Sequence, residues 1–519
     1  MVITEIRGEE RSAGGTRAGD GRRAAVLPVV VGLVAMAAYV RTAMPDVGFW
    51  DTAEFQTILP IMGTAHPTGF PTYVIVGWVA NLLLTPFGEP AYRMNLLSGI
   101  FVAGAAALAV VLARRLTEST SVAIAAGLGL AMTPTAWAIG THADPHALHL
   151  ALVAGLLVLL VGWGDAHAAG SGRADRWLIA ASAVFALAVG NHSLTLLLAV
   201  PVGLYVLAVD PKIVRRPRFV ATCVAVLVGV IVVVYVQMPV RAGIFPAPLI
   251  YGHPETWDGF RYVVLAEQFR GSIVDPLGNL DVKAAELVAL AAAQFGGLAI
   301  LIPLGFVATL ARRPRYALLS GSALAVTVFF SASYVNADIS RYYLVPALIA
   351  WTWLAILAAV VVDQLPMSAS GRGLQRASLV IAGLALLAPT VGALPERAVA
   401  VDRSADLGSR PWTDAALAAF APDAVVVSWW SYSTALWYAQ HVDGRRPDLW
   451  VVDDRTRLDQ NLGDVIDVID ANFGTRPVYL IRTGPGEVVR LRERYVIEPI
   501  GNGQLANVYL VEARVAATE

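Results

Sequence analysis

The sequence is poor in charge and rich in apolar residues. Of its 519 residues 15% are charged, whereas typical soluble domains have about 25%. Hydrophobic residues make up 57% of the chain, and the mean hydropathy is +0.62. An apolar excess of this size has to face something other than water. The composition therefore excludes an ordinary soluble protein and indicates a membrane protein.

Lysine and cysteine are almost absent. Only Lys212 and Lys283 are lysines, and the single cysteine, Cys223, lies in an apolar run. Cys223 therefore makes no disulfide within the chain and no multi-cysteine metal site. The 38 basic and 39 acidic residues nearly cancel, which leaves no overall positive field to attract nucleic acid. The composition thus argues against redox, zinc-binding and nucleic-acid-binding proteins.

Apolar stretches of the length that a bilayer requires recur along the chain. A membrane-spanning helix needs about 20 apolar residues. The first such stretch follows a polar tail at 1–23, and the lack of a cleavage site after it predicts an uncleaved anchor. In total the sequence predicts eleven spans, near residues 24–43, 91–113, 121–140, 147–163, 177–191, 193–209, 219–239, 285–310, 317–335, 342–363 and 377–394.

Arginine clusters between the spans predict the orientation. The clusters lie near residues 114–115, 173–176, 212–218, 312–315 and 372–376. The positive-inside rule places such clusters in the cytoplasm, and eleven crossings from a cytoplasmic amino terminus put all of them there. Three regions then lie outside: a first loop at 41–90, a second loop at 240–284, and the chain after about residue 395.

The carboxyl-terminal segment has a different pattern. Short apolar runs alternate with helical stretches, and the runs cover residues 424–428, 449–454, 477–482 and 506–513. That alternation predicts a small α/β domain with a mostly parallel sheet. The predicted organisation is a cytoplasmic tail (1–23), a transmembrane domain (24–395) and an extracytoplasmic α/β domain (396–519).

Two carboxylates stand in the first external loop. Asp51 and Glu54 are three residues apart, so a helix there places both on one face. Carboxylates next to a membrane are costly and usually functional, and burial raises the pKa of a carboxyl group toward that of a general base. The alternative is that Asp51 caps a helix and Glu54 faces water. A rigid turn from His66 to Pro71 follows, in which His66 is either part of a site or a polar turn residue.

Further polar residues gather at the outer ends of other spans. His142, Asp144 and His146 lie between the third and fourth spans, and Asn191 and His192 lie between the fifth and sixth. Histidine and carboxylate are proper metal ligands. The spacing of the first three matches no metal motif, however, so we expect no metal.

Some arginines break the positive-inside rule. Arg41, Arg93, Arg241 and Arg341 all lie at outer ends of predicted spans. A guanidinium group presents a planar fork of donors suited to phosphate, which points to an anionic lipid headgroup or a phosphorylated substrate. The alternative is that these side chains snorkel to the membrane surface. Arg93 and Arg341 are the better candidates for a phosphate site.

These motifs together resemble the multipass domain-of-unknown-function 2723 family, whose animal relatives are protein O-mannosyltransferases of GT-C type. The family pattern is Asp-x-x-Glu, then His-Pro-Pro-Gly-Tyr-Pro, then Arg-x-Asn-Leu. Its counterparts here are Asp51 to Glu54, His66 to Pro71, and Arg93 with Asn95. The sequence departs from the pattern at Ala53, Thr68 and Phe70, and none of these changes removes a carboxylate or a histidine. The likeness continues through Asp144, Asn191, His192, 258–271, Arg341, Tyr342 and 436–452.

The resemblance implies a fold and a reaction. The fold would be mainly α-helical and GT-C-like, and the enzyme would transfer a sugar, mannose in the relatives, from a polyprenyl-phosphate donor to a protein or glycan hydroxyl outside the cytoplasm. Asp51 or Glu54 would be the catalytic base. The donor is already activated, so no metal or other cofactor is implied. The implied substrate-binding residues are His66, Arg93, Asn95, His142, Asp144, His192 and Arg341.

Two other classes remain open at this stage. A transporter or lipid flippase also has many spans, but it usually carries carboxylates near the bilayer midplane and repeated halves, and neither is evident here. A noncatalytic cell-envelope assembly factor would use Asp51 only to stabilise the loop, so replacing that carboxylate would spare its function. The external domain, with Trp429, Trp430 and Trp437, would stack on sugar rings or use these residues as core.

Overall fold

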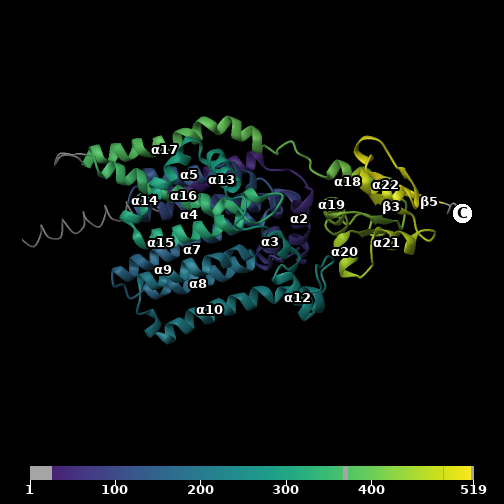
Figure 1. Cartoon of the computed structure of the whole chain (residues 1–519), viewed down its shortest axis with the longest axis horizontal. Helices are drawn as coiled ribbons and strands as arrows, with labels where there is room; N and C mark the ends of the chain where they lie inside the picture. Colours follow the sequence, from purple (N-terminus) through teal and green to yellow (C-terminus); the bar gives the residue numbers. More distant parts are fainter. Residues whose placement is uncertain (1–25, 366–371, 483, 516–519) are drawn as a thin grey trace, which may run out of the picture.

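The protein consists of a long bundle of helices with a smaller sheet domain at one end (Figure 1). The computed structural model describes residues 26–365, 372–482 and 484–515. The predicted cytoplasmic tail at 1–23 lies outside the described residues.

Each predicted span coincides with a helical segment of the bundle. The segments are Val26–Thr42, α4 (Pro90–Thr117), α5 (Thr120–Ala131) with α6 (Pro134–Ile139), α7 (Pro145–Ala168), α8 (Ala174–Asn191), η2 (Ser193–Leu198) with α9 (Ala199–Val209), α10 (Pro217–Tyr235), α13 (Leu280–Phe295) with η6 (Gly296–Leu301) and α14 (Ile302–Arg312), α15 (Pro314–Ser331), η7 (Ile339–Tyr343) with α16 (Leu344–Asp363), and α17 (Arg372–Val401).

The described residues include six helices that are long and apolar enough to cross a membrane. They are Pro90–Thr117, Pro145–Ala168, Pro217–Ile244, Leu280–Arg312, Ile339–Asp363 and Gly373–Val401. The chain is therefore a multipass membrane protein, and eleven crossings remain a prediction. Proline opens several helices of the bundle, including α4, α7, α10 and α15. At the first helical position its missing N–H costs no hydrogen bond.

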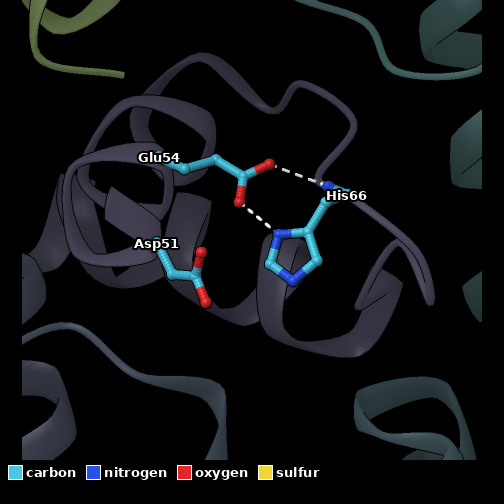
Figure 2. A group of neighbouring side chains, drawn as sticks. All are labelled: Asp51, Glu54 and His66. Carbon is cyan, nitrogen blue, oxygen red and sulfur yellow. Dashed lines mark hydrogen bonds and ion pairs between the residues drawn. The ribbon is translucent and has the colours of Figure 1, made fainter. Parts of the chain in front are cut away.

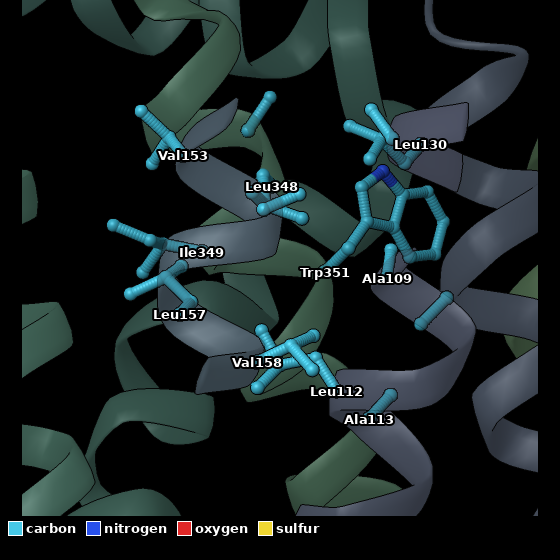
Figure 3. Packing of buried hydrophobic residues seen from close by; sticks show 14 of the residues in the cluster. Ala109, Leu112, Ala113, Leu130, Val153, Leu157, Val158, Leu348, Ile349 and Trp351 are labelled. Carbon is cyan, nitrogen blue, oxygen red and sulfur yellow. The ribbon is translucent and has the colours of Figure 1, made fainter. Parts of the chain in front are cut away.

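Helix α16 lies at the centre of the bundle. Its Trp351 is fully buried, and Figure 3 shows the indole packed near Leu130 and Ala109 of the neighbouring helices α5 and α4. Gly129 on α5 lies directly against this ring, since a Cβ there would come within 2.3 Å of it. By contrast α10 and α17 expose most of their apolar side chains, as expected for helices that face lipid.

The predicted external loops contain helices of their own. The first has α2 (Trp50–Ile61), α3 (Pro71–Leu83) and η1 (Thr85–Phe87). The second begins after α11 (Gln237–Pro239) and the turn η4 (Val240–Ile244), and it contains α12 (Trp257–Val264) and η5 (Glu267–Ser272). A further short turn, η3 (Ile213–Arg215), precedes α10 at the other end of the bundle.

The loops that carry two of the arginine clusters meet, beside the end of α7, at the end of the bundle away from the sheet domain. Arg313 donates to the carbonyl of Leu116 at 3.1 Å, and Arg115 pairs with Asp165 at 3.7 Å. Helix α4 has 28 residues and leads from this end to the sheet domain, where the Ala91 N–H donates to the Tyr438 hydroxyl. A helix of that length spans roughly 42 Å.

The sheet domain is a five-stranded mixed α/β unit. The strand order is β2 (Trp450–Val452), β1 (Val425–Val427), β3 (Val478–Ile481), β5 (Val508–Arg514), β4 (Tyr495–Pro499). The first three strands are parallel and the last two antiparallel, and in register Val426 lies opposite both Val451 and Tyr479. The predicted small α/β domain is confirmed, but only two of the four strand pairings are parallel, so the sheet is mixed rather than mostly parallel, and the sequence did not predict β4. Its helices are α18 (Arg410–Ala419), α19 (Trp430–His441), α20 (Asp454–Asp459), α21 (Val465–Asn472) and α22 (Pro485–Arg492), with the turn η8 (Gly503–Leu505).

An apolar cluster joins the sheet domain to the first loop. Phe55 and Ile58 of α2 belong to the same buried cluster as Trp412, Leu417 and Trp437 of the sheet domain. The carboxyl ends of β1 and β2 point toward the bundle, because the residues that follow them line the cavity described next. The sheet domain therefore packs directly against α2.

Candidate functional site

A cavity of about 990 Å³ lies where the bundle, both external loops and the sheet domain meet. Among the residues predicted as site members, Asp51, His66, His142, His192 and Arg341 line it. Residues far apart in the sequence thus converge on one space, as ligand and active sites generally require.

Asp51 lies in the first turn of α2, between a cation and an indole. Arg341 donates to Asp51 Oδ2 at 3.3 Å, and Trp430 Nε1 donates to Oδ1 at 3.1 Å. Burial by itself raises the pKa of Asp51, but the charges of His66 and Arg341 and these two hydrogen bonds outweigh it and lower the pKa. The prediction that burial would make this carboxyl group a stronger base is therefore wrong. Asp51 is held ionised, with 32% of its side chain exposed.

Glu54 is fully buried behind Asp51 and pairs with His66. Its Oε1 accepts from the His66 backbone N–H at 2.7 Å, and its Oε2 contacts His66 Nδ1 (Figure 2). Burial lowers the pKa of His66, but the charges of Glu54 and Asp51 raise it more, so the net shift is upward. The alternative of a capping aspartate and a water-facing glutamate is wrong, because Asp51 makes no cap hydrogen bond and Glu54 has no exposed surface.

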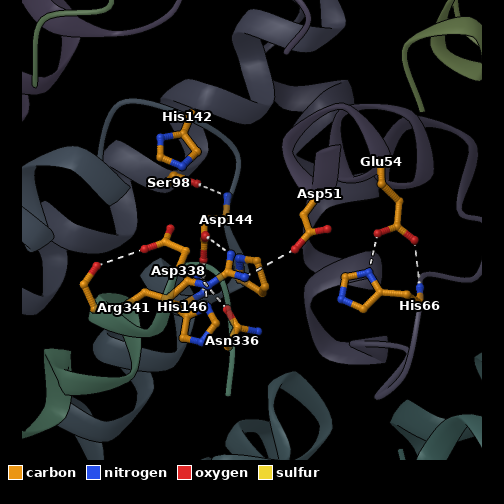
Figure 4. Close-up of polar contacts among 12 residues, drawn as sticks. Asp51, Glu54, His66, Ser98, His142, Asp144, His146, Asn336, Asp338 and Arg341 are labelled. Carbon is orange, nitrogen blue, oxygen red and sulfur yellow. Dashed lines mark hydrogen bonds and ion pairs between the residues drawn. The ribbon is translucent and has the colours of Figure 1, made fainter. Parts of the chain in front are cut away.

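Arg341 links two carboxylates (Figure 4). It donates to Asp51 and, from Nη1, to Asp144 Oδ2 at 3.0 Å, and only 13% of its side chain is exposed. Asp144 is the N-cap of α7, and its Oδ1 accepts from the His146 backbone N–H at 2.7 Å. Snorkelling therefore does not describe Arg341, which points inward. Burial raises the pKa of Asp144, but the charges of His146 and Arg341 lower it by more, so the net pKa lies well below its usual range.

Three histidine side chains near Asp144 also line the cavity: His142, His146 and His192. The His146 and His192 rings are 4.7 Å apart, and His192 also lies 5.4 Å from the ring of Phe70. His146 Nε2 is buried and has no hydrogen-bond partner among the described residues. His142 lines the cavity separately, and burial together with the charge of Arg403 lowers its pKa to about 4. His142 is therefore neutral at physiological pH.

Two residues that were predicted to bind substrate, Arg93 and Asn95, lie outside the cavity. Arg93 donates to the carbonyl oxygens of Gly88 and Asn81, at 2.6 and 3.3 Å, and it does not line the cavity. Asn95 is fully buried outside the cavity, where it donates to the carbonyl of Met44 and accepts from the backbone N–H of Ala143. The structure therefore brings neither residue to the cavity, and Asn95 braces the segments that carry the site.

The sequence offered His142, Asp144 and His146 as possible metal ligands, but the structure groups a different set of ligand atoms. Within the described residues, the atoms of Asp51, Glu54 and His66 lie within 4.8 Å of one another. Glu54 and His66 already bond to each other, and Arg341 compensates Asp51. These carboxylates thus have counter-charges without an ion.

The sheet domain supplies one contact and two residues of the site that sequence reasoning missed. Trp430, expected to stack on sugar rings or to be core, follows β1 and donates to Asp51, whereas Asp453 and Arg455 follow β2 and line the same cavity. The signal was present, because ligands bind at the carboxyl ends of parallel strands and these polar runs come directly after two predicted ones. Tyr251 in the second loop is an aromatic residue of the cavity wall that was also missed.

The overall fold is similar to the folds of two solved proteins, ArnT and AglB. The chain is similar to ArnT from Cupriavidus metallidurans bound to undecaprenyl phosphate, with a TM-score of 0.59, 18% identity, and coverage of 93% of this chain and 97% of that one. It is also similar to the oligosaccharyltransferase AglB from Archaeoglobus fulgidus in complex with an inhibitory peptide and a dolichol-phosphate. That TM-score is 0.55, at 13% identity, and covers 96% of this chain and 77% of AglB. At such identities the likeness shows the fold.

The sequence comparisons point to a particular group. Residues 51–214 match the family model described as the Protein O-mannosyl-transferase TMEM260 N-terminal domain. Protein O-mannosyl-transferase TMEM260 from Mus musculus is 32% identical over 166 residues, which are 32% of this chain and 22% of the mouse protein. The match thus spans about a fifth of that relative. The resemblance to GT-C type protein O-mannosyltransferases is confirmed, and the matched segment contains Asp51, Glu54, His66, Asp144 and His192.

Proposed function

We propose that the protein transfers a sugar from a polyprenyl-phosphate donor to an acceptor hydroxyl at the outer face of the membrane. The observation that carries this proposal is the ionised Asp51, which faces a large cavity at the end of the bundle while Arg341 and Trp430 hold it in place. A fixed carboxylate in such a space can take a proton from a bound hydroxyl group.

The proposed reaction inverts the sugar. The acceptor oxygen attacks the anomeric carbon, the bond from that carbon to the phosphate oxygen breaks, and polyprenyl phosphate leaves with the electron pair. The proton of the acceptor hydroxyl passes to Asp51. That proton becomes acidic as the new bond forms, so a carboxylate with a lowered pKa serves as the base.

Glu54 has a supporting role in this proposal. It is fully buried and bonded to His66, so the acceptor cannot reach it. The pair sets the position of the His66 ring at the cavity wall and adds positive charge beside Asp51. Asp51 is therefore the proposed base, and Glu54 the residue that positions His66.

Arg341 is the proposed partner of the leaving phosphate. Its Nε is buried and has no hydrogen-bond partner among the described residues, so one donor remains available. His192 lies in the same group of side chains, and because its Nδ1 accepts from the Leu194 N–H, its Nε2 carries the proton and is a further donor. Fixed donors at the place where negative charge develops stabilise a transition state strongly. With these donors present, the mechanism needs no metal or other cofactor.

Mannose is the proposed sugar, and protein the proposed acceptor, because the mouse relative is named a protein O-mannosyl-transferase. The cavity and the sheet domain (396–519) are proposed to lie outside the cytoplasm. The arginine-bearing loops at the opposite end of the bundle support that orientation under the positive-inside rule. The transmembrane domain would then cover 24–395.

The test is sugar transfer in membranes supplied with radiolabelled polyprenyl-phosphate mannose. The variant Asp51→Asn keeps the shape of the side chain and loses the base, so we expect transfer to fall at least 100-fold, the lower end of what general bases contribute. Asp414→Asn, an exposed carboxylate of α18 outside the cavity, is the matched control. Equal transfer by the wild type and Asp51→Asn would remove Asp51 as the base.

A further inference from the structure

Two buried side chains of the sheet domain line the cavity and carry polar atoms without a hydrogen-bond partner among the described residues. Asp453 and Arg455 are 1% and 5% exposed, and both line the cavity wall. Neither Asp453 Oδ2 nor Arg455 Nη1 has a hydrogen-bond partner among the described residues. Buried polar groups in native proteins are nearly always paired, so an unpaired acceptor and an unpaired donor on two residues of one cavity wall call for a ligand.

Both side chains are held firmly by their other atoms. Asp453 Oδ1 accepts from the backbone N–H and the hydroxyl of Thr456, at 2.9 and 3.0 Å. Arg455 Nη2 donates to the carbonyl of Ile250 at 2.8 Å, and the guanidinium lies 4.2 Å from the ring centre of Tyr251. The free atoms therefore have fixed positions, as a binding subsite requires.

The subsite adjoins the proposed catalytic group. Arg455 Nη1 lies 4.0 Å from Glu54 Oε1, too far for a hydrogen bond but close enough for attraction between charges. Trp430, which donates to Asp51, also has its ring centre 5.8 Å from the Arg455 guanidinium. A ligand bound to Asp453 and Arg455 would thus lie next to Asp51.

The chemistry favours a peptide over a glycan as the ligand. Sugar sites commonly use open aromatic faces, but the guanidinium of Arg455 already lies over Tyr251, Trp430 and Trp437. What remains free is one donor and one acceptor on residues two apart in the chain. An extended polypeptide offers the complementary pair, a carbonyl oxygen and an N–H group.

We propose that Asp453 and Arg455 form an acceptor subsite that binds the backbone of a polypeptide. A backbone N–H of the acceptor donates to Asp453 Oδ2, and a carbonyl accepts from Arg455 Nη1. This arrangement presents a serine or threonine hydroxyl toward Asp51. The subsite deepens the proposed transferase function and rests on it for the identity of the reaction, but its binding step is measured without any donor.

The experiment measures binding of a fluorescent synthetic peptide rich in serine and threonine to the purified full-length protein. Asp453→Asn keeps an oxygen for the Thr456 cap and replaces the free acceptor with a donor. Arg455→Met removes the free donor. Each variant should weaken peptide binding about tenfold or more, since hydrogen bonds to buried charged groups are strong. Arg445→Met, in the same domain but outside the cavity, should bind the peptide as the wild type does.

The outcomes separate this proposal from the transferase proposal. Peptide affinity that is the same in the wild type, Asp453→Asn and Arg455→Met would overturn the subsite, and so would binding of a neutral labelled oligosaccharide in place of the peptide. Because Asp453→Asn retains the α20 cap, a loss of binding with an unchanged unfolding temperature would support the subsite. If Asp51→Asn leaves transfer intact while these variants lose the peptide, the catalytic assignment fails and the subsite stands.

Discussion

At the scale of single residues, the neighbours of Asp51 decide its ionisation. Its carboxylate is half-enclosed, yet two hydrogen bonds and two positive side chains keep its pKa low. The sequence could predict that Asp51 and Glu54 share a helix face, because that follows from their spacing. It could not predict that Arg341 and Trp430, about 290 and 380 positions later, supply the charge and the hydrogen bond. Tertiary contacts of this range leave no local signal.

The hydrogen bond from Trp430 should be visible in the pH dependence of transfer. The active form of Asp51 is the carboxylate, and the indole N–H stabilises it. In Trp430→Phe this stabilisation is lost, so the pKa of Asp51 rises. On acidification the variant should therefore lose activity at a higher pH than the wild type does. A bond to a charged group is worth about 1.5–3 kcal/mol, so the acid limb of kcat/KM should move up by about one to two pH units.

A second tryptophan of the sheet domain provides the control. Trp412 is buried in α18, and its Nε1 has no hydrogen-bond partner among the described residues. Trp412→Phe therefore makes the same chemical change away from Asp51 and should leave the acid limb where it is. An unmoved acid limb in Trp430→Phe would mean that the indole does not tune the base.

At the scale of elements, the helices of the bundle were predictable and the loops were less so. A bilayer demands long apolar stretches, so composition alone located every helical segment of the bundle. Helix α3 was read only as part of a loop, because its 13 residues are too few to cross a membrane. Strand β4 was missed because its residues alternate between buried and exposed, which leaves no continuous apolar run. Arg93 was misjudged because its local partners, Gly88 and Asn81, satisfy it.

The packing of α5 against α16 depends on one glycine. A methyl group at Gly129 would lie 2.3 Å from the Trp351 ring, which is buried on all sides and cannot move aside freely. Gly129→Ala should therefore destabilise the bundle by about 1–3 kcal/mol, the usual effect of overpacking, although alanine favours helices. The measurement is the midpoint of thermal unfolding in detergent.

Gly104 on α4 is the matched site for comparison. A Cβ there would meet nothing within 4 Å, so Gly104→Ala gains helix propensity without a clash. The midpoint should stay the same or rise in Gly104→Ala and fall in Gly129→Ala. Equal midpoints for the two variants would show that α5 and α16 are not packed as closely as described.

At the scale of the whole molecule, the sheet domain acts as part of the site rather than as an appendage. Its Trp430 touches the proposed base, its Asp453 and Arg455 line the cavity, and its α19 packs on α2. Sequence analysis predicted the domain and its external position, but not which of its residues complete the cavity. Contacts between two separately folding parts are invisible to hydropathy and periodicity, which report on one segment at a time.

The orientation of the whole molecule can be tested with the chain's single thiol removed. In a Cys223→Ser background, Arg490→Cys places one exposed thiol on the sheet domain, and Ser171→Cys places one in the arginine-bearing loop between α7 and α8. The proposed orientation predicts that a membrane-impermeant maleimide labels Arg490→Cys in intact cells and labels Ser171→Cys only after permeabilisation. The reverse pattern would put the cavity in the cytoplasm. The positive-inside rule would then fail for the loops that carry Arg115 and Arg313, whose contacts hold them at one end of the bundle.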